Sequence, residues 1–165
     1  MNRRLPAALL LSACALHLGR AEVHAGALAP SKPSQVVSLI SFGGTCPSGG
    51  ALFGSQTPPD GNFPQPFTIP DGQVLVITEA QLTGSGATAG ASVRILLRRE
   101  TAAGGISEIV NQLVQADADG SYNGSFTFPT GVVVKAGALL CAKAVIGGGS
   151  FGSTGIVHGF LAQDR

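Results

Sequence analysis

The sequence is poor in large aromatic side chains: tryptophan is absent, and Tyr122 is the single tyrosine. Surfaces that bind sugars often present such rings, because a flat aromatic face packs well against the apolar side of a sugar. The lack of tryptophan therefore disfavours a carbohydrate-binding surface without excluding a glycan ligand. The eight phenylalanines are left for the core or for a contact surface.

Charge is also scarce, because Asp, Glu, Lys and Arg together make up 12% of the chain. Three of the ten basic residues and one of the nine acidic ones lie within residues 1–25, so the remainder has a net charge of about −1. Such a domain has no basic footprint for nucleic acid and no polybasic cluster for anionic lipid. We therefore expect no nucleic-acid partner, and membrane contact only through a lipid anchor.

Long hydrophobic runs are absent except near the N-terminus. Residues 5–18 are mainly Leu and Ala, and they follow Arg3 and Arg4. This run of about 14 residues is shorter than the roughly 20 that span a bilayer. A basic start, a short apolar core and small residues after it indicate a removable secretory signal. We therefore predict that residues 1–25 are a signal peptide and that the mature chain starts at Gly26.

Residues 11–14, Leu-Ser-Ala-Cys, offer a second processing route. They resemble the lipobox of bacterial lipoproteins, which implies that Cys14 becomes the first mature residue and carries a lipid. The first route predicts a secreted or periplasmic protein. The second predicts a protein anchored by its lipid in the bacterial outer membrane. Either route leaves the other two cysteines of the chain to pair with each other.

Those two cysteines, Cys46 and Cys141, are expected to form a disulfide in the oxidising environment that exported proteins meet. The bond would join the start of the domain to its penultimate strand. In that strand Cys141 shares a face with Lys143, opposite Leu140, so the bond is expected to lie outside the core and to hold the loop around Cys46 over the sheet. Residues 26–34 are predicted to be a linker, and residues 35–165 a single domain.

The domain shows the alternation of apolar and polar residues that is typical of β-strands, with turns rich in Gly, Pro and Asp between the apolar stretches. One segment, 106–115, also carries a helical stripe of apolar residues. Its β-branched content favours a strand, and a helix remains the alternative. The other predicted strands are 35–42, 67–69, 74–82, 93–100, 122–128, 132–134, 139–146 and 155–163.

About eight short strands predict an all-β domain built as an antiparallel β-sandwich. An immunoglobulin-like sandwich carries a buried tryptophan between its paired cysteines. Since the chain has no tryptophan, a jelly-roll-like arrangement is the preferred prediction.

Residues 43–66 contain five prolines and six glycines and are predicted to be one long loop. Loops of this length in compact domains are commonly functional or disordered. Phe53 and Phe63 lie in this loop with few strand neighbours to pack on. We therefore predict that they form a contact surface, with cover of one end of the sandwich as the alternative.

No motif in the chain predicts a catalytic centre or a cofactor. Residues 148–152 fit Gly-x-Ser-x-Gly, but this motif needs a helix after its serine, and a strand is predicted there. His158 is the only histidine after residue 25, which leaves too few ligands for a zinc site. Asp117 and Asp119 form a weak calcium candidate, because the third oxygen ligand and the final Glu of a calcium loop are absent.

The sequence thus predicts an exported, non-enzymatic β-domain that binds an unidentified protein or glycan or builds a cell-surface structure. One alternative is an exported hydrolase that uses carboxylates or His158. Another is a surface component that self-assembles into a homo-oligomer through its edge strands.

Overall fold

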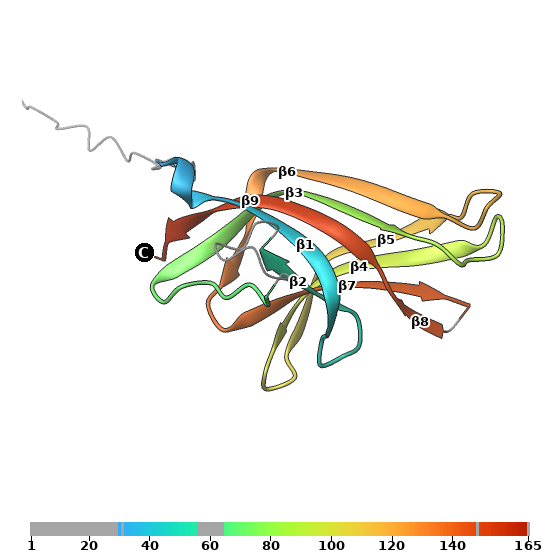
Figure 1. Cartoon of the computed structure of the whole chain (residues 1–165), viewed down its shortest axis with the longest axis horizontal. Helices are drawn as coiled ribbons and strands as arrows, with labels where there is room; N and C mark the ends of the chain where they lie inside the picture. Colours follow the sequence, from blue (N-terminus) through green and yellow to red (C-terminus); the bar gives the residue numbers. More distant parts are fainter. Residues whose placement is uncertain (1–29, 31, 56–64, 148, 165) are drawn as a thin grey trace, which may run out of the picture.

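The computed structural model describes residues 30, 32–55, 65–147 and 149–164. The predicted signal segment, including Cys14, lies outside these residues, and so does Phe63. Apart from a short 3-10 helix, η1 (Pro33–Gln35), the described chain consists of antiparallel strands and turns (Figure 1). The strands are β1 (Val36–Thr45), β2 (Ala51–Ser55), β3 (Gln73–Gly84), β4 (Ser92–Thr101), β5 (Ile106–Gln115), β6 (Tyr122–Lys135), β7 (Ala138–Ile146), β8 (Gly149–Gly152) and β9 (Thr154–Gln163).

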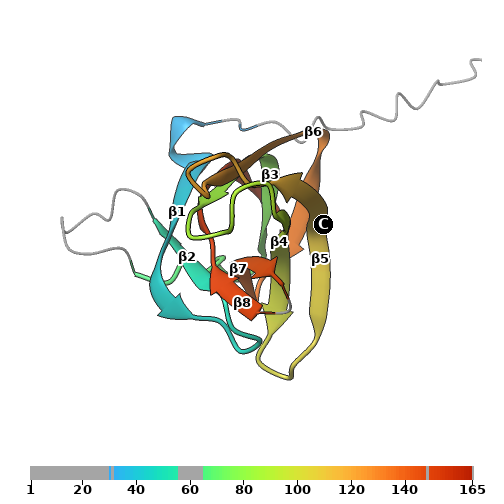
Figure 2. The same cartoon turned by 90° about the vertical axis from the view of Figure 1, so that its right-hand side faces the viewer.

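The strands form one continuous sheet in the order β5-β4-β7-β2-β1-β9-β3-β6, and β8 pairs with the end of β7. The sheet curls until its edge strands, β5 and β6, lie near each other. Seen along the long axis, the strands surround the core as a nearly closed barrel (Figure 2). The all-β antiparallel prediction is confirmed, but the two separate sheets of a sandwich are not found.

The β1–β2 hairpin explains why the sheet is not divided in two. β1 pairs with β9 on one side and with β2 on the other, and β2 pairs in turn with β7. Hydrogen bonding therefore passes without a break from one half of the molecule to the other. Register shifts in four strand pairs bend the sheet further, since bulges increase local twist.

The core fills the inside of the barrel. On β4 the alternation predicted from the sequence is observed, because Val93, Ile95 and Leu97 are fully buried inside. Segment 106–115 is the strand β5, as preferred over a helix. Since β5 lies at the edge of the sheet, Val110 is its one buried residue, and Ile109 and Val114 are partly buried against the core.

β3 departs from simple alternation, which would place Val74, Val76, Ala80 and Leu82 on one face. The strand has a register shift between Ile77 and Glu79 against both of its neighbours. An extra residue reverses the alternation of side chains, because successive residues point to opposite faces. Ala80 and Leu82 therefore join the inner core, whereas Val74 and Val76 pack outside with Phe160.

Two predicted loops also contain strand. The turn expected at residues 129–131 is part of β6, where Val132 pairs with Ile77 and Thr127 with Glu79, so the residues between them form a bulge. The long loop predicted at 43–66 holds the end of β1 and all of β2. Short strands within Gly- and Pro-rich sequence lack a clear alternation, which is why the sequence pattern missed them.

Candidate functional site

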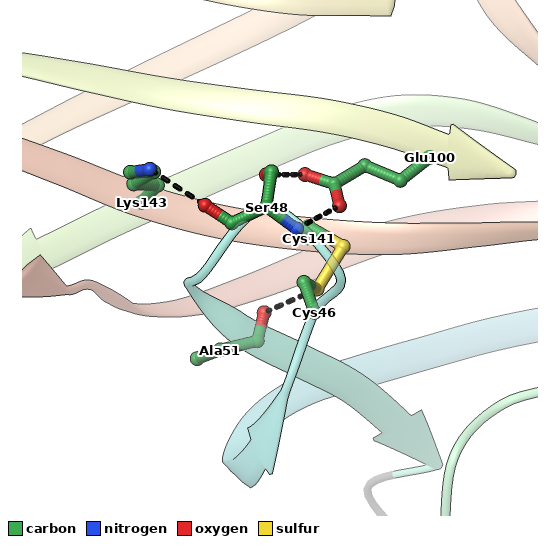
Figure 3. The surroundings of a disulfide bond; sticks show 6 residues. All are labelled: Cys46, Ser48, Ala51, Glu100, Cys141 and Lys143. Carbon is green, nitrogen blue, oxygen red and sulfur yellow. Dashed lines mark hydrogen bonds between the residues drawn. A yellow bond between two sulfur atoms is a disulfide. The ribbon is translucent and has the colours of Figure 1, made fainter. Parts of the chain in front are cut away.

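The outer surface of β4 and β7 carries a cluster of two cysteines and buried or half-buried charged groups, and the turn between β1 and β2 covers it. This turn, residues 46–50, is closed by hydrogen bonds between the backbones of Cys46 and Gly50 and of Gly49 and Cys46. Cys46 and Cys141 lie at disulfide distance, with bonded sulfur atoms and Cα atoms 6.2 Å apart (Figure 3). This arrangement agrees with the pairing expected from the sequence.

Cys141 leaves β7 on the outer face, since its neighbours Leu140 and Ala142 belong to the inner core. It is nevertheless only 1% exposed, and Cys46 only 2%. The turn that Cys46 begins is therefore held over the sheet as a second layer. We call residues 46–50 with their contacts on β4 and β7 the anchored turn.

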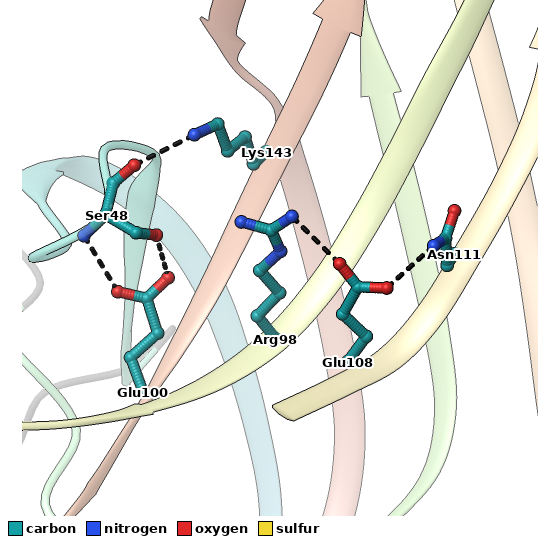
Figure 4. A network of polar contacts seen from close by, with 6 residues as sticks. All are labelled: Ser48, Arg98, Glu100, Glu108, Asn111 and Lys143. Atoms are coloured by element: carbon teal, nitrogen blue, oxygen red, sulfur yellow. Dashed lines mark hydrogen bonds and ion pairs between the residues drawn. The ribbon is translucent and has the colours of Figure 1, made fainter. Parts of the chain in front are cut away.

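Glu100 is the polar centre of the anchored turn. It is only 1% exposed, and its carboxylate accepts hydrogen bonds from the Ser48 hydroxyl and, at 3.0 Å, from the Ser48 backbone N–H. On the other side of the turn, Lys143 Nζ donates to the Ser48 carbonyl oxygen at 2.8 Å (Figure 4). Burying a carboxylate is costly unless it is hydrogen-bonded, and the two bonds from Ser48 to Glu100 offset that cost.

A second polar group lies beside the anchored turn on the same face. Arg98 Nη2 donates to Glu108 Oε1 on β5 at 2.9 Å, and Asn111 Nδ2 donates to Glu108 Oε2 at 2.7 Å (Figure 4). Both oxygens of Glu108 are thus engaged by neighbouring side chains. These contacts tie β4 to the edge strand β5. Because both carboxylate oxygens of Glu108 accept hydrogen bonds, neither is free to act as a catalytic base.

The structure brings three potential metal ligands together at the anchored turn. Ligand atoms of Cys46, Glu100 and Cys141 lie within 4.8 Å of one another, and no other such group of three occurs among the described residues. Metals bind cysteine as the thiolate. Because the two sulfurs are bonded to each other, this group does not form a metal site in the oxidised protein.

Asp117 and Asp119, the calcium candidates, lie in the turn between β5 and β6. The Asp119 carboxylate accepts hydrogen bonds from the Ser121 backbone N–H at 3.0 Å and from its hydroxyl at 2.6 Å. These bonds hold the pKa of Asp119 below its usual 3.8. The same turn is bonded to the β3–β4 turn through Ala87 and Gly120. The described groups around Asp119 therefore serve to shape a turn.

His158 lies on the outer face of β9, where its Nδ1 is 3.1 Å from the Ser38 hydroxyl of β1. On the other side of β9, Glu79 of β3 is the residue directly opposite His158. A serine, a histidine and a carboxylate therefore occupy one row across three neighbouring strands. The sequence could not reveal this row, because the strands β1, β3 and β9 are far apart in the chain.

Phe53 does not supply the predicted contact surface. It is part of β2, is 2% exposed and packs in the inner core. This is a correction that follows from the strand within the predicted loop: a side chain on the inward face of a strand is buried. Phe63 and Cys14 lie outside the described residues.

No known protein family matches the sequence, and no curated protein matches it either. Within the described part of the chain, the structure has no helix that is long and apolar enough to cross a membrane. The function is therefore argued from the arrangement of the residues themselves.

Proposed function

We propose that the chain is an exported, disulfide-bonded β-domain that acts by binding rather than by catalysis. The anchored turn is the observation that carries the proposal. Its buried carboxylate, Glu100, is occupied by Ser48, and its two cysteines are joined, so this group stabilises the fold instead of presenting reactive atoms. A disulfide of this kind suits an oxidising compartment, in agreement with the secretory pattern of residues 1–25.

We further propose that the barrel follows a jelly-roll path. The support is the nested pairing of its strands: β4 pairs with β5, β3 with β6, β2 with β7 and β1 with β9. Such nesting results when one long antiparallel hairpin is rolled up. The jelly roll has eight principal strands of this kind, and β8 is then a short addition to β7.

Export is tested by expressing the full chain in a Gram-negative bacterium and measuring its intact mass in each cell fraction. We expect either a chain starting at Gly26 or a chain starting at a lipid-modified Cys14. A Cys14→Ala variant separates the two routes, because it removes only the lipid attachment. Reduction should add the mass of two hydrogens to the mature protein. An unprocessed chain in the cytoplasm with free thiols would refute the proposal.

Hydrolysis is the second candidate function, and the row of Ser38, His158 and Glu79 favours it. In enzymes with an activated serine, the serine lies next to a base such as histidine, and the histidine lies next to an acidic group. However, such enzymes also need donors aimed at the developing oxyanion. β9 is paired on both sides, with β1 and β3, so its backbone around His158 is engaged in the sheet. Binding therefore remains the preferred proposal.

A fluorophosphonate probe decides between these two functions, because it modifies activated serines covalently. We expect no labelling of the mature protein beyond that of a Ser38→Ala variant. Labelling that is lost in both Ser38→Ala and His158→Ala would establish the hydrolase instead. Ser121, which is bonded to a carboxylate but not to a histidine, offers a control substitution.

A further inference from the structure

A pocket of about 350 Å³ lies at the end of the barrel where β4 and β6 finish. The β4–β5 turn forms one wall and the β6–β7 turn the other. At the opposite end of these strands, the β3–β4 and β5–β6 turns are bonded to each other. The lining residues are Arg99, Thr101, Gly105, Ile106, Ser107, Lys135, Ala136, Gly137 and Ala138.

Arg99 places a positive charge in this pocket. It continues the alternation of Ile95 and Leu97 along β4, and the residue opposite it on β7 is the core residue Leu140. Its side chain therefore leaves β4 on the inner face, at the mouth of the barrel. Within the described chain, the structure gives the Arg99 guanidinium no hydrogen bond or ion pair. This contrasts with Arg98, whose charge is paired with Glu108.

The other cation of the pocket, Lys135, is already balanced. Its Nζ lies 3.3 Å from a carboxylate oxygen of Asp164. No acidic residue lines the pocket. The electrostatic balance of the pocket is thus positive, and Arg99 provides it. A guanidinium presents a planar fork of donors that matches a carboxylate in a bidentate manner.

The rest of the lining is mostly small or apolar. Ala136 and Ala138 contribute methyl groups, and Ile106 is 51% exposed beside them. Ligand pockets commonly range from about 300 to 1,000 Å³, so this one has room only for a small molecule. A charged group at Arg99 and an apolar wall next to it suit a ligand with a carboxylate at one end and a short hydrocarbon body.

We propose that the pocket binds a small aliphatic carboxylate, with Arg99 holding its charged end. This inference rests on the proposed binding function and specifies its ligand class. Arg99 is the residue that determines specificity for the anion, and Ile106 and the two alanines accept the hydrocarbon. Lys135 contributes less, because Asp164 already pairs with it.

The test is a titration of the full mature protein, labelled with ¹⁵N, with sodium hexanoate at constant ionic strength. We expect saturable shifts of the backbone amides of Gly105 and Gly137 in the pocket walls. An Arg99→Gln variant should bind at least about tenfold more weakly, since it removes the charge-assisted hydrogen bonds to the carboxylate. Arg94→Gln, an exposed arginine on the same strand but outside the pocket, is the matched control and should bind as the wild type does.

Two further measurements keep the ligand class falsifiable. Hexanamide has the same hydrocarbon and no charge, so it should bind much more weakly than hexanoate, while Lys135→Gln should weaken hexanoate binding less than Arg99→Gln. Equal shifts with both ligands, or hexanoate binding that Arg99→Gln leaves unchanged, would overturn the proposal. That result would leave export and disulfide formation intact, and the fractionation and mass measurements test those independently.

Discussion

Removing the disulfide should cost the protein several kcal/mol of unfolding free energy. The bond joins residues separated by 95 positions in the sequence. For a loop of that length, the chain-entropy relation gives about 4.7 kcal/mol at 25 °C, and measured disulfides typically contribute about 2–4 kcal/mol. We therefore expect a Cys46→Ala, Cys141→Ala double variant to lose about 2–5 kcal/mol.

The folded state should survive this change, because the anchored turn has other contacts. Ser48 still bonds to Glu100 on β4 and to Lys143 on β7. These contacts act in the folded protein and do not restrict the unfolded chain, whereas the disulfide restricts it. The loss is thus expected mainly through the unfolded state, with native chemical shifts nearly unchanged away from the turn.

Urea unfolding followed by far-ultraviolet circular dichroism is the suitable assay, since the chain has no tryptophan to report by fluorescence. For a small domain the slope is about 1–3 kcal/mol per molar urea. A loss of about 3 kcal/mol should therefore lower the midpoint by about 1–3 M. The oxidised wild type, the reduced wild type and the double variant are compared under the same conditions.

The reduced wild type separates loop entropy from packing, because it keeps both buried sulfur atoms. If constraint of the unfolded chain dominates, reduction and double substitution should lower the midpoint by similar amounts. Reductant should leave the double variant unchanged, which controls for effects of the reagent. An unchanged midpoint in wild type whose mass shows two free thiols would refute the reasoning.

Three further predictions concern buried groups. Burial raises the pKa of the Tyr122 phenol above 10.0, so the protein should lose stability as the pH rises through the folded-state pKa. Tyrosinate absorbance measures this pKa directly, because Tyr122 is the single tyrosine. A folded-state pKa equal to that of the urea-unfolded chain would contradict the prediction. Glu100→Gln should lower the free energy of unfolding, measured by thermal unfolding, by about 1–3 kcal/mol, because one oxygen that accepts a Ser48 bond becomes an amide donor. The control Glu79→Gln, at an exposed residue, should change stability by less than about 0.5 kcal/mol. Equal effects of the two substitutions would contradict a stabilising role of Glu100. Gly84→Ala should cost about 1–3 kcal/mol, since its methyl group would overlap the Tyr122 ring, and a wild-type midpoint would refute that clash.

The strands themselves could be predicted because half-buried strands record their orientation in the alternation of side chains. β4 illustrates this, with Val93, Ile95 and Leu97 inside as the pattern indicated. In β5 the β-branched residues favoured the strand over the helical stripe, and the strand is found. Each of these inferences depends on local sequence alone.

Features that depend on pairing between distant strands could not be predicted. The bulge of β3 near Thr78 is a property of its registers with β6 and β9. It reverses which residues face the core, and no composition signal marks it. The closure of the sheet into a barrel likewise depends on the order of the strands, and the row of Ser38 and His158 exists only because β1 lies next to β9.

Glu100 shows where alternation reaches its limit and how the disulfide extends it. Alternation along β4 puts Glu100 on the outer face, opposite Ile95 and Leu97, but alternation does not say what covers that face. Cys141 does carry this information: an outward cysteine in a disulfide requires another chain segment with its Cα about 4.4–6.8 Å away. The turn that carries Cys46 also reaches the adjacent strand β4, where the Ser48 backbone N–H bonds to Glu100. In this chain the paired, outward-facing Cys141 therefore marks the place where a charged residue, Glu100, is buried despite its position on the solvent side of the sheet.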